Sequence, residues 1–305
     1  MILVVGATGM VGGQVCRRLA ARGIPARALV RATSDPAKVE ALRGLGIDVV
    51  TGDVRDAASL AEACRQVTAV ISTLSSMPFS YEPGVNDIAT TDRDGLVRLI
   101  DAARDAGVRQ FVYTSFSGNI DLSFPLRDAK RAVETHLRAS GMRWTILRPS
   151  YFMEGWLSPA VGFDAPAATA TLYGDGTSPI SWISLADVAS FAVASLDEPA
   201  AADATLELGG PQALAPLQVV RIFERLGGRT FPVQHVPVEA LAAQQAAADD
   251  PMQQSFSGLM RCYALGDPIE MRSVLDAFPV HLTTVEEYAA RTLEVPGPAP
   301  ATAGV

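Results

Sequence analysis

The chain has few cysteines and few histidines for its 305 residues, and it carries no run of basic residues. The cysteines are Cys16, Cys64 and Cys262, and the histidines are His136, His235 and His281. Neither set contains the close pairs or clusters that mark a zinc site or a secreted disulfide scaffold. We therefore expect no metal site, and we expect a protein of the reducing cytoplasm.

Long hydrophobic runs are also missing, and none approaches the roughly 20 residues that span a bilayer. The apolar opening of residues 1–5 ends at Gly6 and has no basic leader, so it predicts a first strand rather than a signal peptide. The formal net charge of -8 disfavours a nonspecific surface for nucleic acid or anionic membrane. We expect neither nucleic acid nor membrane as a partner.

Short apolar runs alternate with amphipathic segments through the first half of the chain, which is the pattern of βαβ units. The predicted strands cover residues 2–5, 26–30, 47–51, 69–73, 109–114 and 143–147, with one more near 205–208. The predicted helices cover residues 11–21, 38–42, 86–106, 127–139, 184–196, 217–226 and 284–292. The sequence therefore predicts an α/β fold, with a Rossmann-type doubly wound parallel sheet and a smaller C-terminal α/β cap.

A glycine-rich loop follows the first predicted strand and leads directly into a helix. It reads Gly6-Ala7-Thr8-Gly9-Met10-Val11-Gly12. In such a loop Gly6 permits a sharp turn, Gly9 lets the backbone approach a pyrophosphate, and Gly12 lets helix and strand pack closely. The helix N-terminus then offers free amides and a favourable dipole to the phosphates. We expect a dinucleotide contacted by Gly6, Thr8, Gly9, Met10 and Val11; the alternative is a tight turn without a ligand.

The second predicted strand ends at Arg31, where an NAD-preferring site often has an acidic residue for the ribose hydroxyls. Arg31 could stack on adenine and donate to a 2'-phosphate, with Thr33, Ser34 and Lys38 close enough to help. The sequence therefore favours NADP(H) over NAD(H). The alternative for Arg31 is a solvated surface arginine. Asp53, after the third strand, could accept from the adenine amino group or could be an ordinary turn aspartate.

Several motifs together resemble those of one family. They are the glycine loop, Val30-Arg31, Gly52-Asp53-Val54, Phe111-Val112-Tyr113-Thr114-Ser115, Lys130, and the run from Leu147 through Arg148-Pro149-Ser150-Tyr151-Phe152-Met153 to Glu154. With them the chain resembles the NmrA-like branch of atypical short-chain dehydrogenase/reductases. That family comprises NAD(P)-binding reductases of quinones, dyes and phenylpropanoid double bonds, together with members that bind the cofactor as redox sensors.

The resemblance implies positions for the rest of the cofactor site. It places Val54 beside Asp53, Thr73, Leu74 and Ser75 along the nicotinamide half, Lys130 at the nicotinamide ribose, and residues 149–152, including Pro149 and Phe152, in the wall beside the ring. On this basis residues 1–150 form an NAD(P)-binding Rossmann domain and residues 151–295 a smaller substrate and cap region interleaved with the sheet. Residues 296–305 are rich in proline and alanine and predict a disordered tail. Residues 239–254 are expected to be mobile or to border the active-site opening.

Most short-chain dehydrogenases place a tyrosine four residues before the lysine, and here that position is Leu126. Lys130 could still orient the ribose and stabilise developing negative charge, unless it is a solvated lysine on an exposed helix face. Ser115 could bond a substrate oxygen or be a turn residue. Tyr151 and Phe152 could stack on a flat acceptor or pack in the core.

The leading hypothesis is an NAD(P)H-dependent oxidoreductase that transfers hydride from NADPH to a planar conjugated acceptor of the quinone, azo or enone type, without a Tyr-Lys dyad. Its catalytic candidates are Lys130, Ser115 and Tyr151. The alternative is a non-catalytic NAD(P) redox sensor of the NmrA type, and a third possibility is a tailoring enzyme of secondary metabolism. We expect a small aromatic or conjugated substrate and a monomer or homodimer.

Overall fold

The computed structural model describes residues 1–78 and 80–294, and its main feature is a seven-stranded sheet. The strand order is β3-β2-β1-β4-β5-β6-β9, and every neighbouring pair is parallel. The strands are β1 (Ile2–Val5), β2 (Ala26–Val30), β3 (Asp48–Thr51), β4 (Ala69–Ser72), β5 (Gln110–Thr114), β6 (Arg143–Pro149) and β9 (Ala204–Leu208). The sheet confirms the predicted α/β fold. The predicted disordered tail, residues 296–305, lies outside the described residues.

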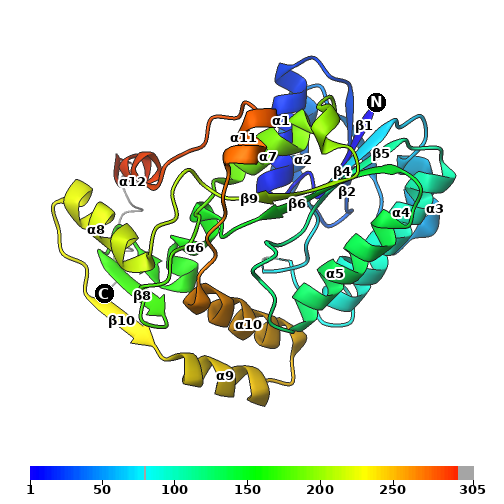
Figure 1. The fold of residues 1–305 in the computed structure, drawn as a ribbon. Helices are drawn as coiled ribbons and strands as arrows, with labels where there is room; N and C mark the ends of the chain where they lie inside the picture. Colours follow the sequence, from blue (N-terminus) through cyan, green and yellow to red (C-terminus); the bar gives the residue numbers. More distant parts are fainter. Residues whose placement is uncertain (79, 295–305) are drawn as a thin grey trace, which may run out of the picture.

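Helices cover both faces of this sheet, with α1, α2 and α7 on one side and α3, α4 and α5 on the other (Figure 1). Side chains of each strand alternate between the two cores, so that Val4 enters one and Leu3 and Val5 enter the other. The helices are α1 (Met10–Ala21), α2 (Pro36–Gly44), α3 (Ala57–Ala63), α4 (Asp94–Asp105), α5 (Pro125–Arg138) and α7 (Leu185–Ala194). Burial on both faces explains why the central strands β1, β4 and β5 are largely apolar runs.

The second part of the chain, which we call the cap, contains a smaller sheet with the order β10-β8-β7. The cap has its own apolar core. Its strands are β7 (Phe163–Asp164), β8 (Thr169–Tyr173) and β10 (Val233–Val236). The other elements there are α6 (Met153–Trp156), η2 (Pro159–Val161), η3 (Pro199–Ala201), α8 (Pro216–Gly227), α9 (Val238–Ala247), α10 (Pro251–Leu265), α11 (Arg272–Ala277) and α12 (Val285–Glu294). Helix α10 lies between β8 and α5 and so joins this region to the main sheet (Figure 1).

One predicted helix is wrong in its start and in its type. Residues 86–106 do not form a single α-helix, because a π-helix, η1 (Ile88–Arg93), precedes α4. Asp87 caps η1: its carboxylate accepts from the Thr90 amide at 2.8 Å, while the Thr90 hydroxyl accepts from the Asp87 amide at 3.2 Å. The helical segment therefore begins at Ile88. Its first turns have π-helical hydrogen bonds between residues five apart, a feature that is frequent at functional sites.

The region of residues 239–254 forms parts of two helices, α9 and α10. The break between them lies at Asp250, whose carboxylate caps α10 at the Met252 amide and accepts from the Tyr81 hydroxyl at 3.0 Å. Helix α10 packs against α5. That residues 239–254 border the active-site opening stays a prediction. Among the described helices, none is long and apolar enough to cross a membrane.

Candidate functional site

The glycine loop lies at the carboxyl end of β1, beside the point where the order of strands reverses between β1 and β4. Gly6 has a φ of +84°, which only glycine adopts readily, and this confirms its role in the sharp turn. A Cβ on Gly12 would lie 2.1 Å from the Gly6 carbonyl oxygen. The close packing of α1 against β1 therefore requires glycine at this position.

The N-terminus of α1 offers backbone amide donors to an anion. Gly9 is its N-cap and gives no side-chain cap, and the first turn holds no acidic residue. Gly9 is exposed, and Met10 is 48% exposed although it is apolar. Thr8 and Val11 are partly exposed on either side. An exposed, uncapped helix start with no negative charge fits the pyrophosphate of a dinucleotide.

Arg31 follows β2 at the same edge of the sheet and is partly exposed. Its backbone amide donates to the Ser34 hydroxyl at 3.1 Å, and the Ser34 amide donates back to the Arg31 carbonyl at 2.9 Å. Lys38 is exposed on the first turns of α2. Arg31 and Ser34 thus close one turn that includes exposed Thr33, and the Ser34 hydroxyl already accepts one hydrogen bond there, whereas Lys38 lies on the helix that follows.

Asp53 follows β3 and is held by a residue that the sequence did not single out, Arg55. The Arg55 guanidinium donates to the Asp53 carboxylate at 2.7 and 2.9 Å, and its backbone amide donates at 2.9 Å. These bonds with Arg55, aided by the charge of Arg31, lower the pKa of Asp53. The ion pair supports the alternative of a structural turn aspartate, while Val54 is buried in the core. The arginine two residues after Asp53 was the available sequence signal.

Thr73, Leu74 and Ser75 follow β4 and are all partly exposed. Thr73 lies directly against the glycine loop, since its Oγ1 would be 2.9 Å from a Cβ on Gly6, and its amide donates to the Val5 carbonyl. The parallel pairing of β1 with β4 brings these two loops to one edge. This placement supports the predicted grouping of the glycine loop with the segment after β4.

Lys130 lies on α5 and is only 4% exposed, which excludes the alternative of a solvated lysine. Its Nζ donates to the Thr114 carbonyl at 3.4 Å and lies 5.0 Å from the ring centre of Phe116 and 5.5 Å from that of Tyr113. Burial lowers the pKa of Lys130, and the charges of Asp92 and Glu134 oppose that effect. A buried cation at the end of β5 is a group that can stabilise negative charge in a reacting partner.

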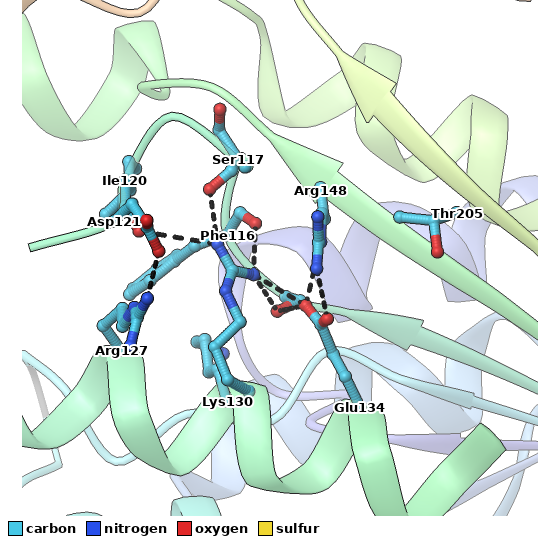
Figure 2. Close-up of polar contacts among 12 residues, drawn as sticks. Phe116, Ser117, Ile120, Asp121, Arg127, Lys130, Glu134, Arg148 and Thr205 are labelled. Atoms are coloured by element: carbon cyan, nitrogen blue, oxygen red, sulfur yellow. Dashed lines mark hydrogen bonds and ion pairs between the residues drawn. The ribbon is translucent and has the colours of Figure 1, made fainter. Parts of the chain in front are cut away.

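Glu134, one turn after Lys130 on α5, is the centre of an ion-pair network (Figure 2). Its carboxylate is 1% exposed and pairs with Arg131 at 2.7 Å and with Arg148 of β6. The Ser115 hydroxyl donates to Glu134 at 2.6 Å and is itself 2% exposed. Despite burial, these partners hold the pKa of Glu134 at about 2. The geometry supports a structural role for Ser115 rather than contact with a substrate.

The same network fixes the loop between β5 and α5. Arg131 donates to the carbonyls of Phe116 at 2.9 Å and Ser117 at 2.7 Å. Glu207 of β9 pairs with Arg148 at 3.0 Å and accepts from the Gly118 amide at 2.8 Å. The loop that precedes the helix of Lys130 is therefore held at each residue from Phe116 to Gly118.

Tyr151 is 2% exposed and lies in an aromatic cluster of the cap. Its ring meets Trp156 edge-on with centres 4.8 Å apart and Tyr263 with centres 5.8 Å apart, and its hydroxyl donates to the Leu259 carbonyl at 3.0 Å. These contacts support the packing alternative for Tyr151. Phe152 is partly exposed against the core beside α1 and α7, and Pro149 is buried at the end of β6.

Asp92 and Ser76 are buried polar residues that sequence reasoning missed. Asp92 of η1 is fully buried, and its Oδ2 accepts from the amide of Ser76 at 3.0 Å and from the Ser76 hydroxyl. Burial raises the pKa of Asp92, and the charge of Lys130 opposes that effect. The only sequence signal was an aspartate within an otherwise ordinary polar segment.

Comparison with known proteins agrees with this arrangement. The model of the NmrA-like family matches residues 1–289. An NAD(P)H azoreductase of Xenophilus azovorans is 32% identical over 282 residues, which are 92% of each protein. An isoflavone reductase homolog of Zea mays is 30% identical over 317 residues, covering 96% of this chain and 98% of that protein.

Solved structures show the same fold. An NADPH-dependent quinone oxidoreductase of Escherichia coli, complexed with NADPH, has a TM-score of 0.78 at 24% identity and covers 96% of this chain and 100% of its own. The triphenylmethane reductase of Citrobacter, with NADP(H), has a TM-score of 0.76 at 20% identity, with coverage of 96% and 100%. The family match over nearly the whole chain, with the two relatives above, shows that this protein belongs to the NmrA-like family.

Proposed function

We propose that this protein is an NADPH-dependent reductase that acts on a planar, conjugated, electron-poor acceptor of the quinone, azo or enone type. The observation that carries the proposal is the buried ammonium of Lys130 beside a glycine loop fitted for a dinucleotide, with Leu126 where a dyad tyrosine would stand. Leu126 is itself buried in the apolar core of the cap. The azoreductase relative supports the reaction class.

The residues have separate tasks in this proposal. NADPH, when bound, supplies a hydride to the acceptor. The start of α1 binds its pyrophosphate, and Arg31 with Ser34 and Lys38 binds its 2'-phosphate. Lys130 bonds the nicotinamide ribose and stabilises the negative charge that develops on the acceptor. A conjugated acceptor spreads that charge over its own atoms, so hydride transfer does not need a simultaneous proton from a dyad tyrosine, and the anion that forms takes its proton from water.

Turnover is tested by loss of NADPH absorbance with panels of quinones, azo dyes and enones. Lys130→Met should lower kcat by about 100-fold, the usual cost of losing one group that stabilises developing charge, while Lys130→Arg retains more activity. NADPH affinity should change much less than kcat. Tight NADPH binding with no consumption by any acceptor class would overturn the proposed activity.

Cofactor choice is tested by titrating NADPH and NADH against the wild type and Arg31→Ala. The variant should lose about tenfold or more in NADPH affinity and little in NADH affinity, because only NADPH carries the phosphate. Arg43→Ala is the matched control, since Arg43 is exposed on α2 and pairs with Glu40 at the surface. Equal losses for both cofactors in Arg31→Ala would remove the phosphate role.

A redox sensor is the second candidate, and one observation favours it. The hydroxyls of Ser115 and Tyr151 both donate within the protein, to Glu134 and to the Leu259 carbonyl, so neither faces an acceptor as a free proton donor. A sensor should bind NADPH and NADP+ with clearly different affinities and turn over neither. Similar affinities for the two forms would count against it.

A further inference from the structure

The buried amino group of Lys130 has no carboxylate among its direct contacts in the described residues. Its one hydrogen bond in the described part of the chain goes to a neutral carbonyl, that of Thr114, and no carboxylate lies within ion-pair distance of its Nζ. The faces of Tyr113 and Phe116 provide only weak attraction. Burial favours the neutral amine of a lysine, and a negative charge nearby favours the ammonium.

Glu134 is the nearer carboxylate in sequence, but it is already occupied. It pairs with Arg131, Arg138 and Arg148, and Arg148 shares its charge with Glu207. Three guanidinium groups thus face two carboxylates in this network, which has a surplus of positive charge. The network therefore carries a net positive charge, and the charge of Glu134 has a smaller effect on Lys130 than that of Asp92.

Asp92, by contrast, has a negative charge with no positive partner at ion-pair distance among the described residues. It is fully buried in η1, which packs against α5, and its hydrogen bonds come from the amide and the hydroxyl of Ser76. Its Oδ1 has no hydrogen-bond partner among the described residues, and no lysine or arginine there pairs with it at close range. A buried carboxylate without a cation and a buried ammonium without an anion therefore lie on two elements in contact.

We propose that Asp92 is a positioning residue for the reaction: it is the charge partner of Lys130 and, through Ser76, the anchor of the segment that follows β4. The inference rests on the proposed function, in which Lys130 acts as a cation beside the acceptor. Asp92 thereby couples the two parts of the site, the lysine on α5 and residues 73–75 beside the glycine loop.

The charged groups around Lys130 determine how the loss of the Asp92 charge should change the pKa of Lys130. The groups that face it are Asp92 from η1, Tyr113 from β5, and Glu134 and Arg131 from α5 itself. Helix α10 also packs against α5, but its contacts there are neutral: Ser255 accepts from the Leu126 amide, and Gly258 meets Phe124. Burial lowers the pKa of Lys130, so removal of the Asp92 charge should lower it further.

The direct test is the titration of Lys130 by NMR in protein labelled at the lysine ε-carbon, without any cofactor. The chain has only two lysines, so the signal of exposed Lys38 is an internal reference. Asp92→Asn should make proton binding at Lys130 about tenfold weaker, which is one pKa unit, and leave the Lys38 signal as it is. An unchanged midpoint for Lys130 would overturn the proposal.

A matched control is Asp187→Asn, which neutralises another buried carboxylate. Asp187 lies on α7, on the opposite face of the sheet, and accepts from the Thr283 amide at 2.8 Å. This variant should leave the Lys130 midpoint where it is. If Asp92→Asn does not fold, the wild type decides: its Lys130 signal should be that of an ammonium at neutral pH, and a neutral amine there would overturn the proposal.

The anchoring role has its own readout. Ser76→Ala keeps both charges and removes the hydroxyl bond, so NADPH should bind about threefold or more weakly while Lys130 remains an ammonium at neutral pH. Unchanged NADPH affinity would remove the anchoring part. These results are separable from the proposed activity, because a protein that binds NADPH and reduces nothing would still show the Lys130 shift in Asp92→Asn.

Discussion

Gly12 stands where the first turn of α1 crosses the end of β1, and its neighbour Gly13 does not share that constraint. A Cβ on Gly12 would lie 2.1 Å from the carbonyl oxygen of Gly6 and 2.7 Å from its carbon, and backbone atoms cannot rotate away. A Cβ on Gly13 would meet nothing closer than the Ala7 carbonyl oxygen at 3.6 Å. The structure therefore has room for a side chain at position 13 but not at position 12.

Gly12→Ala should lower the free energy of unfolding by about 3 kcal/mol, because α1 must move off the strand to admit the methyl group. It should also abolish tight NADPH binding, since the same movement displaces the glycine loop. Gly13→Ala is the control, and it should raise stability by up to about 1 kcal/mol through helix propensity. Denaturant melts and NADPH titrations measure both effects; equal stability of the two variants would contradict the packing argument.

Helix α5 combines two charge systems one turn apart. Lys130 faces β5 and η1, whereas Glu134 faces the arginines that fasten the loop before the helix and the neighbouring strand β6 (Figure 2). The position of Lys130 thus depends on Glu134 without any direct bond between them. A substitution of Glu134 should therefore lower the stability of the protein. It should affect the reaction only indirectly, by displacing the loop that precedes the helix of Lys130.

Glu134→Gln should lower the free energy of unfolding by about 3 kcal/mol at neutral pH, because it removes the buried carboxylate charge that pairs with the partly buried guanidinium groups of Arg131 and Arg148. The wild type should lose stability as pH falls from about 4.5 to about 2. The folded-state pKa of Glu134 is depressed, so its stabilisation is full above its ordinary value and disappears as the folded protein takes up the proton.

Unfolding curves across that pH range test the assignment, with Glu40→Gln as the control. Glu40 pairs with Arg43 at the surface, where a single ion pair contributes little. The difference between wild type and Glu134→Gln should shrink toward pH 2, while Glu40→Gln should follow the wild type throughout. A difference that stays constant with pH would show that the carboxylate charge is not what stabilises the network.

At the scale of the whole molecule, three apolar cores support the site, two on the faces of the main sheet and one in the cap. The cap meets the helix of Lys130 where α10 approaches the start of α5. A Cβ on Gly258 would lie 2.4 Å from the ring of Phe124, which is 2% exposed. The absence of a side chain at Gly258 sets how closely the two regions dock.

Gly258→Ala should therefore destabilise the protein by about 1–3 kcal/mol and lower its Tm, since the Phe124 ring has no room to yield. Gly44→Ala, at the end of α2, is the control because a Cβ there would meet nothing within 4 Å. Thermal melts of the two variants give the comparison. If both melt like the wild type, the contact between α10 and α5 is not tight.

Every strand of the main sheet was predictable, because each one contains a short apolar run between turn residues. The small sheet of the cap was missed: β7 has two residues, and β10 places Gln234 and His235 between its two valines, so neither shows an apolar run. Helix α4 was predicted too long because a π-helix and an α-helix share the same polar composition. Pattern reasoning thus failed where a strand lacks an apolar run or the backbone is irregular.

The sequence by itself determined the glycine loop, the uncapped start of α1, the place of Arg31 and the absence of a tyrosine four residues before Lys130. These depend on backbone freedom and on spacing along one strand or helix, which are local properties. Only the tertiary structure decided that Lys130 is buried and that the hydroxyls of Ser115 and Tyr151 donate to groups of the protein itself. It also revealed the contacts of three residues that the sequence did not single out, Asp92, Arg55 and Glu134. Burial and charge pairing depend on which elements pack together, and Asp92 and Lys130 come from separate helices that only the folded sheet brings into contact.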